Sequence, residues 1–385
     1  MQEHHDELQN KYEAMEKDAR GEIIAAARLV ATTLARFRTV KPVYDGAYDV
    51  VLIDEAAAAS LPEVLLAVAK AGTCAVLLGD FMQLGPVLPS ALERSDRPEV
   101  KKWLFTAAFR HCGIATPEQA RQHPSCVVLD TQHRFGPDVM ELANRIAYGG
   151  LLKAGTVVRA HREEDPELVL IDTDSLGDLA EVQREGSGVK GWWAAGLLLS
   201  RVLVERHRDV GEEVGVVVPY GLQAEATLEA LRDVEAGGPL AEVGTAHKFQ
   251  GREFPVVVFD TVETRLGGPG WVAQATLGDG NSWHRDGMRL VNVAVTRVKH
   301  RLYVIASGGR VRLAPSGTAL GHFRDRLAQG RALRVSAAKL ITPSGWDPLP
   351  LGPESAALAE VRDLPGQGEG RLQGPGPAGG PEAFR

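Results

Sequence analysis

Cysteine is scarce in this sequence, and the spacing of the few cysteines excludes two of their common uses. The 385 residues contain three, Cys74, Cys112 and Cys126, and no two of them form a Cys-Xaa-Xaa-Cys pair. A disulfide framework usually has an even number of cysteines, and a cysteine-based zinc site has closely spaced pairs. We therefore predict three reduced thiols and no zinc site built from cysteine.

Long apolar runs are absent as well. The longest, at 194–200 and 214–220, fall well short of the roughly 20 residues that cross a bilayer. The first 20 residues are charged throughout and lack the apolar core and small-residue cleavage site of a secretion signal. These absences predict a cytoplasmic protein with no membrane segment.

An excess of basic residues is also missing. The formal net charge is -7, so the chain has no overall positive charge that would attract nucleic acid. Local grooves can still be basic, and nucleic-acid binding is therefore not excluded.

Segments with strand and helix patterns alternate along most of the chain. After an amphipathic helix that ends near residue 27, the sequence predicts strands at 28–33, 48–54 and 74–80 and a helix at 61–72. A second set follows, with strands at 126–130, 168–172, 214–218, 256–260 and 302–306 and helices at 137–147, 192–206 and 222–234. The segment 48–54 is apolar at consecutive positions, as a strand covered on both faces requires. This alternation is typical of a doubly wound α/β fold, here formed twice.

Acidic side chains follow two apolar strands of the first set. Asp54 and Glu55 emerge at the carboxyl end of one strand, where open α/β sheets bind their ligands. The second strand ends in Gly79 and Asp80, with Gln83 three residues further on. A carboxylate oxygen suits Mg²⁺, and a neighbouring carboxylate can accept the proton of an attacking water. A solvated acidic turn is the alternative interpretation of the first pair.

The segments around these residues resemble motifs of a known enzyme family. VVLIDEAAAAS (50–60) looks like motif II and LLGDFMQLGPV (77–87) like motif III of superfamily 1 helicases, in the 5′→3′ branch that includes the nonsense-mediated-decay helicase and its bacterial relatives. Further segments follow in family order: the early nucleic-acid motif at 27–37, motif IV at 127–152, a Pro-Tyr segment at 214–223, motif V at 243–260 and motif VI at 289–306. Motif IV departs from the family pattern at His133 and Phe135.

The resemblance implies two RecA-like doubly wound parallel-sheet domains, of which the first is incomplete. It assigns 1–26 to a helix left from the family's stalk insertion, 27–120 to the partial first domain with motifs II and III, and 121–330 to the second domain with motifs IV to VI. The segment 331–385 becomes rich in Gly and Pro and is predicted to form a largely disordered tail.

The resemblance also implies a nucleotide site that uses ATP and Mg²⁺. Asp54 would hold the metal and Glu55 would act as general base, while Arg134 and Arg297 would face the γ-phosphate as arginine fingers from the second domain. Further contacts to the nucleotide or the attacking water would come from Gln83, Asp80, Gln250, Gly251 and Glu253. Surface salt bridges are the alternative interpretation of the arginines, and a plain turn is the alternative for 250–253.

Contacts with single-stranded nucleic acid, DNA in preference to RNA, are implied in the same way. Threonine hydroxyls can donate to phosphates without reading the base sequence. The implied contact residues are Thr32, Thr33, Pro219, Tyr220, Thr245 and Thr296. Strand propensity is the alternative explanation of the threonines, and Tyr220, like Phe249, can be a core aromatic instead. His133 and His247 have no partner at metal-ligand spacing, so Mg²⁺ is the only metal predicted.

One family feature does not occur in the printed residues. A phosphate-binding loop usually ends in Gly-Lys-Ser/Thr, and the 385 residues contain no Gly-Lys pair. We therefore expect the part of a helicase that begins after this loop, with an open apolar edge on the strand at 74–80. Two functions stay open. One is an N-terminally truncated ATP-dependent helicase or translocase that needs a separate chain to supply the loop segment. The other is a catalytically inactive scaffold that binds nucleic acid or protein.

Overall fold

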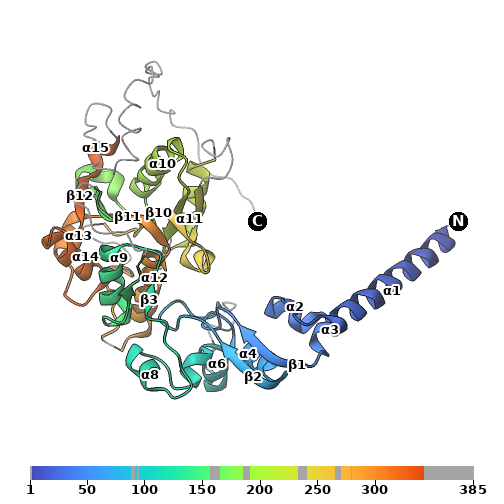
Figure 1. The fold of residues 1–385 in the computed structure, drawn as a ribbon. Helices are drawn as coiled ribbons and strands as arrows, with labels where there is room; N and C mark the ends of the chain where they lie inside the picture. Colours follow the sequence, from blue (N-terminus) through green and yellow to red (C-terminus); the bar gives the residue numbers. More distant parts are fainter. Residues whose placement is uncertain are drawn as a thin grey trace.

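The computed structural model describes residues 2–87, 92, 95–156, 165–184, 191–232, 241–264, 270–278 and 280–341. These residues form two α/β lobes (Figure 1). The N-terminal lobe runs from α1 to α8 and has a two-stranded parallel sheet, and the C-terminal lobe runs from β3 to α15 around a six-stranded parallel sheet. The predicted α/β class with parallel sheets is confirmed.

The N-terminal lobe combines several helices with two strands. Its elements are α1 (Gln2–Ala26), α2 (Leu34–Thr39), α3 (Lys41–Tyr44), β1 (Tyr48–Ile53), α4 (Leu61–Val68), β2 (Ala71–Leu77), α6 (Pro98–Leu104), α7 (Ala108–His111) and α8 (Pro117–Gln122). Helix α1 extends away from the rest of the lobe (Figure 1). None of the described helices is long and apolar enough to cross a membrane.

The β1–β2 sheet is covered on one side and open on the other. On the covered side, Ile53 and Val64 belong to a small buried core. On the open side, the exposed fraction is 50% for Val50 and 63% for Leu52. The prediction that 48–54 is a fully buried strand is therefore wrong, because no described layer covers this side. Among the described residues β2 pairs with β1 alone, which agrees with the predicted open edge.

Six parallel strands form the sheet of the C-terminal lobe, in the order β12-β5-β11-β10-β8-β9. They are β5 (Leu168–Asp172), β8 (Val214–Val218), β9 (Ala241–Thr245), β10 (Phe254–Asp260), β11 (Val298–Ala306) and β12 (Leu333–Ser336). Two smaller sheets pair β3 (Thr131–Gln132) with β4 (Lys153–Ala154), and β6 (Gln183–Arg184) with β7 (Gly191–Trp192).

Helices pack against both faces of the six-stranded sheet. They are α9 (Pro137–Ala143), η1 (Asn144–Tyr148), η2 (Thr173–Ala180), α10 (Ala194–Asp209), α11 (Gly221–Ala230), η4 (Ala246–Phe249), α12 (Ser282–Thr296), α13 (Gly308–Arg312), α14 (Ala319–Ala328) and α15 (Ala337–Ile341). Along β5, Leu168 and Leu170 pack into one core and Val169 and Ile171 into the other, and all four are buried. A doubly wound parallel sheet is therefore confirmed for this lobe.

Three predictions about individual segments are wrong. The segments 28–33 and 126–130 form no strand, and α4 ends at Val68 instead of continuing to residue 72. The segment 126–130 has strand propensity, but it pairs with no described strand before β3 begins at Thr131, and its Val127 and Leu129 side chains stay exposed. The chain from residue 71 pairs with β1, and this pairing ends the helix.

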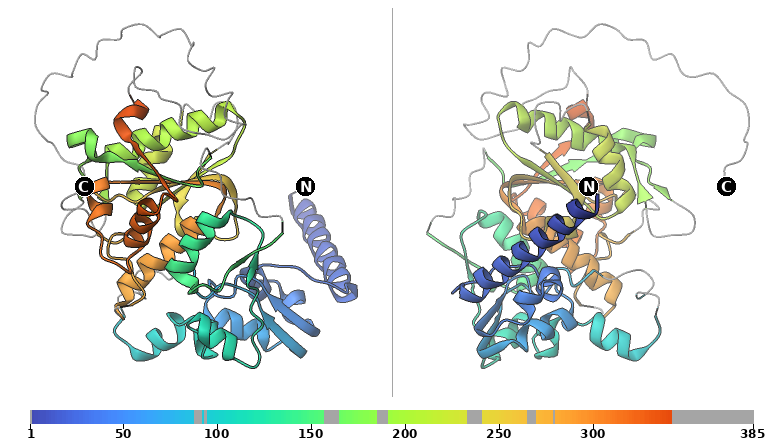
Figure 2. Two further views of the ribbon diagram at one scale, coloured as in Figure 1. Left: turned by 60° about the vertical axis from the view of Figure 1, so that its left-hand side comes forward. Right: turned by 90° about the vertical axis from the view of Figure 1, so that its right-hand side faces the viewer.

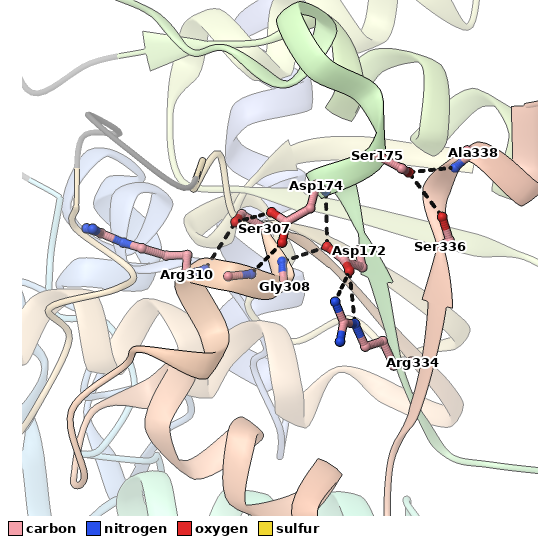
Figure 3. Close-up of polar contacts among 10 residues, drawn as sticks. Asp172, Asp174, Ser175, Ser307, Gly308, Arg310, Arg334, Ser336 and Ala338 are labelled. Atoms are coloured by element: carbon pink, nitrogen blue, oxygen red, sulfur yellow. Dashed lines mark hydrogen bonds and ion pairs between the residues drawn. The ribbon is translucent and has the colours of Figure 1, made fainter.

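The carboxyl end of β5 ties the last described elements to the sheet (Figure 3). The Asp172 carboxylate accepts the backbone N–H of Gly308 at 2.7 Å and pairs with the Arg334 guanidinium of β12. A Cβ atom at position 308 would lie 2.5 Å from Asp172, so glycine is needed there. The sheet thus includes 333–336, which the sequence places in the tail, whereas 342–385 lie outside the described residues.

The two lobes meet where α9 and α12 lie between the six-stranded sheet and the N-terminal lobe (Figure 2). The loop after β2 enters this contact, because Met82 and Leu84 are buried in a core of the C-terminal lobe. The Asn292 side chain of α12 donates to the Met82 carbonyl at 3.2 Å. Polar side chains of this loop therefore lie at the interface between the lobes.

The open side of the β1–β2 sheet predicts self-association. We expect the double substitution Val50→Lys, Leu52→Lys to reduce concentration-dependent association, measured by sedimentation velocity, because both side chains are at least half exposed. As a control, Leu170→Lys in a strand buried on both faces should unfold the C-terminal lobe. Unchanged association of the double variant would contradict this prediction.

Candidate functional site

Two carboxylates emerge where β1 ends. The Asp54 carboxylate accepts the backbone N–H of Glu55 at 2.9 Å, and Glu55 has a left-handed backbone with a φ of 51°. Gly79, beside the end of β1, has a φ of 156°, and a Cβ atom there would lie 3.1 Å from the Ala56 nitrogen. Glycine therefore allows the two strand ends to approach, and backbone conformations of this kind are frequent at functional sites.

Asp80 and Gln83 connect the N-terminal lobe to an arginine of the other lobe. The Asp80 Oδ2 atom accepts the side-chain amide of Gln83 at 2.9 Å. With its nitrogen turned to Asp80, the Gln83 amide presents Oε1 to the Arg297 guanidinium at 2.5 Å. A carboxylate of one lobe is thus linked through one amide to a cation of the other.

Arg297 is buried at this interface, directly after α12. Its guanidinium also donates to the Arg252 carbonyl at 3.3 Å, and its Nε atom has no partner among the described residues. Burial and the nearby charge of Arg134 lower the pKa of Arg297, whereas Glu55 and Asp80 act in the opposite direction. Glu55 and Asp80 of the N-terminal lobe therefore lie close enough to Arg297 for their charges to affect its pKa.

Arg134 comes from the turn before α9, and Gln132 shapes that turn by accepting the Arg134 backbone N–H at 2.9 Å. The Arg134 guanidinium donates to the Thr296 carbonyl at 2.7 Å and pairs with Glu253. Burial raises the pKa of Glu253, but the charges of Arg134 and Lys299 outweigh it and hold this pKa below its usual value. Arg134 is thus fixed beside Arg297 by a salt bridge and a carbonyl.

The turn 250–253 faces the N-terminal lobe. The Gln250 side chain donates to the Leu84 carbonyl at 3.1 Å. Gly251 has a φ of 75°, and a Cβ atom there would lie 3.9 Å from Glu55 Oε1, so this carboxylate lies opposite the turn. The structure thus gathers at the interface most of the residues predicted for nucleotide binding: Glu55, Asp80, Gln83, Arg134, Gln250, Gly251, Glu253 and Arg297.

Asp54 lies next to Glu55 with an exposed side chain. Mg²⁺ in nucleotide sites is commonly bound through one or two carboxylates together with phosphate oxygens and water. An exposed carboxylate beside a second one fits that donor set. Among the described residues no group of three or more His, Cys, Asp or Glu side chains forms a metal site, so phosphate and water would supply the other ligands.

The residues predicted to contact nucleic acid are not all brought together. Pro219 and Thr245 lie at the carboxyl ends of β8 and β9, whereas Thr296 precedes the amino end of β11. The Thr296 hydroxyl donates back to the Asn292 carbonyl at 2.7 Å. In the N-terminal lobe, Thr33 caps α2, directly after the exposed Thr32.

Tyr220 and Phe249 are packed in the C-terminal lobe. The Tyr220 ring is buried, with its centroid 6.0 Å from that of Trp271. Phe249 is fully buried, with its centroid 5.4 Å from that of Phe254. Burial of both rings favours their interpretation as core aromatics over stacking on a base.

Sequence reasoning missed two interface residues, Tyr148 and Asn292. The Tyr148 hydroxyl lies 2.5 Å from Asp80 Oδ2 and 2.8 Å from Asn292 Nδ2. A signal for Asn292 exists, because it interrupts an otherwise apolar face of α12 and such a polar residue needs partners. Tyr148 has no comparable signal, because its contact with Asp80 joins residues far apart in the chain.

Two buried carboxylates lie at the opposite, carboxyl edge of the six-stranded sheet. Asp260 accepts the Trp193 indole N–H at 2.7 Å and the Gln223 amide at 2.6 Å, and Glu263 accepts the Ala273 backbone N–H at 3.2 Å. Burial raises the pKa of Asp260 to about 6 and that of Glu263 to about 7, although these hydrogen bonds oppose the shift. Both groups therefore titrate close to neutral pH.

Comparison with known families agrees with this arrangement. Two family models, each described as an AAA domain, match the chain: one over residues 115–308, just over half of its length, and one over residues 1–91. The chain belongs to this AAA domain family, and within it the chain is a superfamily 1 helicase region.

Curated helicases are similar to the same region. The DNA replication ATP-dependent helicase/nuclease JHS1 of Arabidopsis thaliana is 28% identical over 68% of this chain and 19% of its own length. The ATP-dependent helicase NAM7 of Saccharomyces cerevisiae is 26% identical over 78% of this chain and 30% of its own length. An uncharacterized ATP-dependent helicase of Methanocaldococcus jannaschii, MJ0104, is 26% identical over 68% and 36%. The chain thus spans about a third or less of each relative.

Because the ends of the two strands approach closely at Gly79, a larger residue there should destabilise the N-terminal lobe. We expect Gly79→Ala to lower the free energy of unfolding of the N-terminal lobe by about 1–3 kcal/mol, because the new Cβ atom meets two backbone nitrogens at an unfavourable φ. Gly85→Ala is the matched control, since nothing lies within 4 Å of its Cβ position. Thermal unfolding of both variants measures the difference, and equal losses would show that the strand ends are not tightly closed.

The buried carboxylates predict a stability that falls as pH rises. A carboxyl group with a raised folded-state pKa binds its proton more tightly when folded, so its contribution is complete below the unfolded pKa and is lost through the folded one. With folded pKa values of about 6 and 7, we expect the unfolding free energy to drop by roughly 2–4 kcal/mol from pH 5 to 8.

The double substitution Asp260→Asn, Glu263→Gln should flatten this decline, whereas Asp209→Asn, at an exposed carboxylate of the same lobe, should preserve it. Chemical denaturation at a series of pH values measures the slope. A slope that survives the double substitution would assign it to other groups.

Proposed function

We propose that this chain forms the nucleotide-responsive part of an ATP-dependent helicase or translocase that moves on single-stranded nucleic acid. The observation that carries the proposal is the Gln83–Arg297 hydrogen bond, which joins the lobes directly beside the Glu55 carboxylate. Carboxylates on one lobe that face guanidinium groups on the other suit a triphosphate with a bound cation. DNA is the preferred strand, because a relative is named as a DNA replication helicase.

In this proposal each charged group has one task. Glu55 accepts a proton from the attacking water as oxygen bonds to the γ-phosphorus, and the bond to the bridging oxygen of ADP breaks. Arg297 and Arg134 stabilise the negative charge that spreads over the γ-phosphate oxygens. Mg²⁺ at Asp54, when bound, would neutralise phosphate charge. Gln83 holds Arg297 in the position from which its guanidinium reaches the phosphate.

The salt bridge between Arg134 and Glu253 bears on this assignment. A guanidinium that is already paired with a carboxylate and a carbonyl is aimed in advance, so less side-chain entropy is lost when phosphate arrives. A phosphate oxygen then shares or replaces Glu253 as partner.

The phosphate cradle is the part that the 385 residues do not supply, since they contain no Gly-Lys pair. We propose that a segment carrying such a loop pairs with the open edge of the β1–β2 sheet and covers its exposed side. The apolar side chains of Val50 and Leu52 are suited to contact such a segment. Binding of this segment would both cover the open side of the β1–β2 sheet and complete the nucleotide site.

The function predicts ATP hydrolysis that depends on Glu55. We expect the chain, co-expressed with a segment that carries a Gly-Lys-Thr loop, to hydrolyse ATP faster when oligo-dT is added. Glu55→Gln should slow turnover by about 100-fold or more, the usual contribution of a general base. Glu99→Gln, at an exposed acid of α6, serves as the control.

Oligonucleotide binding separates this function from the scaffold alternative. Strand binding that weakens with salt but is unaffected by ATP and by Glu55→Gln, with no hydrolysis above background, would favour a binding scaffold.

A further inference from the structure

Tyr148 occupies a contact between the lobes that the proposed chemistry leaves unused. It is the last residue of η1, and its side chain is buried. Its hydroxyl lies 2.5 Å from Asp80 Oδ2 of the N-terminal lobe and 2.8 Å from Asn292 Nδ2 of α12. One hydroxyl therefore joins three elements from both lobes.

The local fold presents Tyr148 in this direction. Residues Asn144–Tyr148 form a single π-helical turn directly after α9, and the turn ends at Gly149, whose φ is 58°. One extra residue in a turn rotates the following side chains by about 100° relative to a continued α-helix. The Asn144 side chain fixes the end of the turn by bonding to both the N–H and the carbonyl of Leu152.

The hydrogen-bond directions around Tyr148 are determined by its partners. The Asp80 carboxylate can only accept, so the phenol donates its proton to Asp80, and its oxygen accepts from the Asn292 amide. Burial, together with the Asp80 charge, holds the pKa of Tyr148 well above its usual value, so the phenol keeps its proton. The contact thus has a single arrangement at physiological pH.

Asp80 connects Tyr148 to the residues of the proposed nucleotide site. The oxygen that accepts from Tyr148 also accepts from the Gln83 amide nitrogen, which fixes the orientation of that amide. The remaining Gln83 oxygen then faces Arg297. A continuous chain of hydrogen bonds runs from Tyr148 through Asp80 and Gln83 to Arg297.

We propose that Tyr148 is a positioning residue that locks the two lobes together at Asp80 and thereby aims Arg297 at the phosphate. The lock itself rests on the contacts above, and its effect on turnover rests on the proposed function. Loss of the hydroxyl would leave the ring in place, but Asp80 would then be held only by the Met82 backbone N–H and the Gln83 amide of its own loop. The orientation of Asp80, and with it that of Gln83, would be less restricted.

The test compares two tyrosines that both lose a buried hydroxyl. Tyr148→Phe removes the contact between lobes. Tyr303→Phe is the matched control, because Tyr303 is fully buried and its hydroxyl contacts His207 at 3.0 Å within the C-terminal lobe. Both substitutions keep an aromatic ring of the same size, so they differ in whether a contact between lobes is lost.

The first measurement is the distance between lobes in the full chain, by pulsed electron resonance. Spin labels are placed on the exposed Cys112 and on a cysteine introduced by Leu313→Cys, at a position that is 73% exposed, with Cys74 and Cys126 replaced by serine. We expect Tyr148→Phe to broaden the distance distribution and shift it to longer values, while Tyr303→Phe keeps the parent distribution. An unchanged distribution for Tyr148→Phe overturns the lock.

The second measurement is ATP turnover under the conditions given above. Tyr148→Phe should lower kcat on the order of tenfold, as expected for one lost hydrogen bond to a charged group, with little change in KM. Tyr148→Phe combined with Asp80→Asn should lower kcat no further than Asp80→Asn alone, because both act on Gln83. Fully additive losses would overturn the positioning role. If the parent chain does not hydrolyse ATP, the proposed function fails, while the distance measurement still decides the lock.

Discussion

The hydrogen bond from the Arg297 guanidinium to the Gln83 amide is the contact on which the geometry of the interface depends. A buried guanidinium needs acceptors, because an unpaired charge in a low-dielectric interior is very costly. Arg297 finds one acceptor in its own lobe, the Arg252 carbonyl, and the other in the N-terminal lobe. Burying this cation between the lobes costs desolvation free energy, and its acceptors offset that cost. Closure of the interface therefore depends on the Gln83 contact as well as on apolar packing.

The balance of charge at the interface follows from the same constraint. Arg134 and Arg297 repel each other, and the like charge contributes to the lowered pKa of Arg297. Glu253 compensates Arg134, and Glu55 and Asp80 compensate Arg297 from the other lobe. In the proposed function, the two neighbouring guanidinium groups, already fixed in place, would give a bound phosphate two oriented partners.

The sequence predicts those parts of the fold whose information is local. The segment 168–171 is apolar at every position, which predicts a strand covered on both faces, and the structure has such a strand there. The carboxyl end of β1 could be located in the same way. The fate of 126–130 could not, because strand pairing depends on partners elsewhere in the chain, and among the described residues this segment has none. The Tyr148–Asp80 contact is likewise invisible in the sequence, since neither residue type nor spacing links two residues in different lobes.

Residues with proposed functions lie at both ends of the strands in the six-stranded sheet. Arg297 and Glu253 directly precede the paired strands β11 and β10, and the Phe254 N–H donates to the Arg297 carbonyl at 2.9 Å, so both charged groups lie at the amino edge. Pro219 and Thr245 lie at the carboxyl edge. The seven residues of β10 span roughly 20 Å between these edges.

Because a sheet packed on both faces moves as a rigid body, a rotation of the lobe about the Gln83–Arg297 contact would displace the carboxyl edge further than the amino edge. Small changes at a nucleotide would then become larger movements where a nucleic-acid strand is proposed to bind.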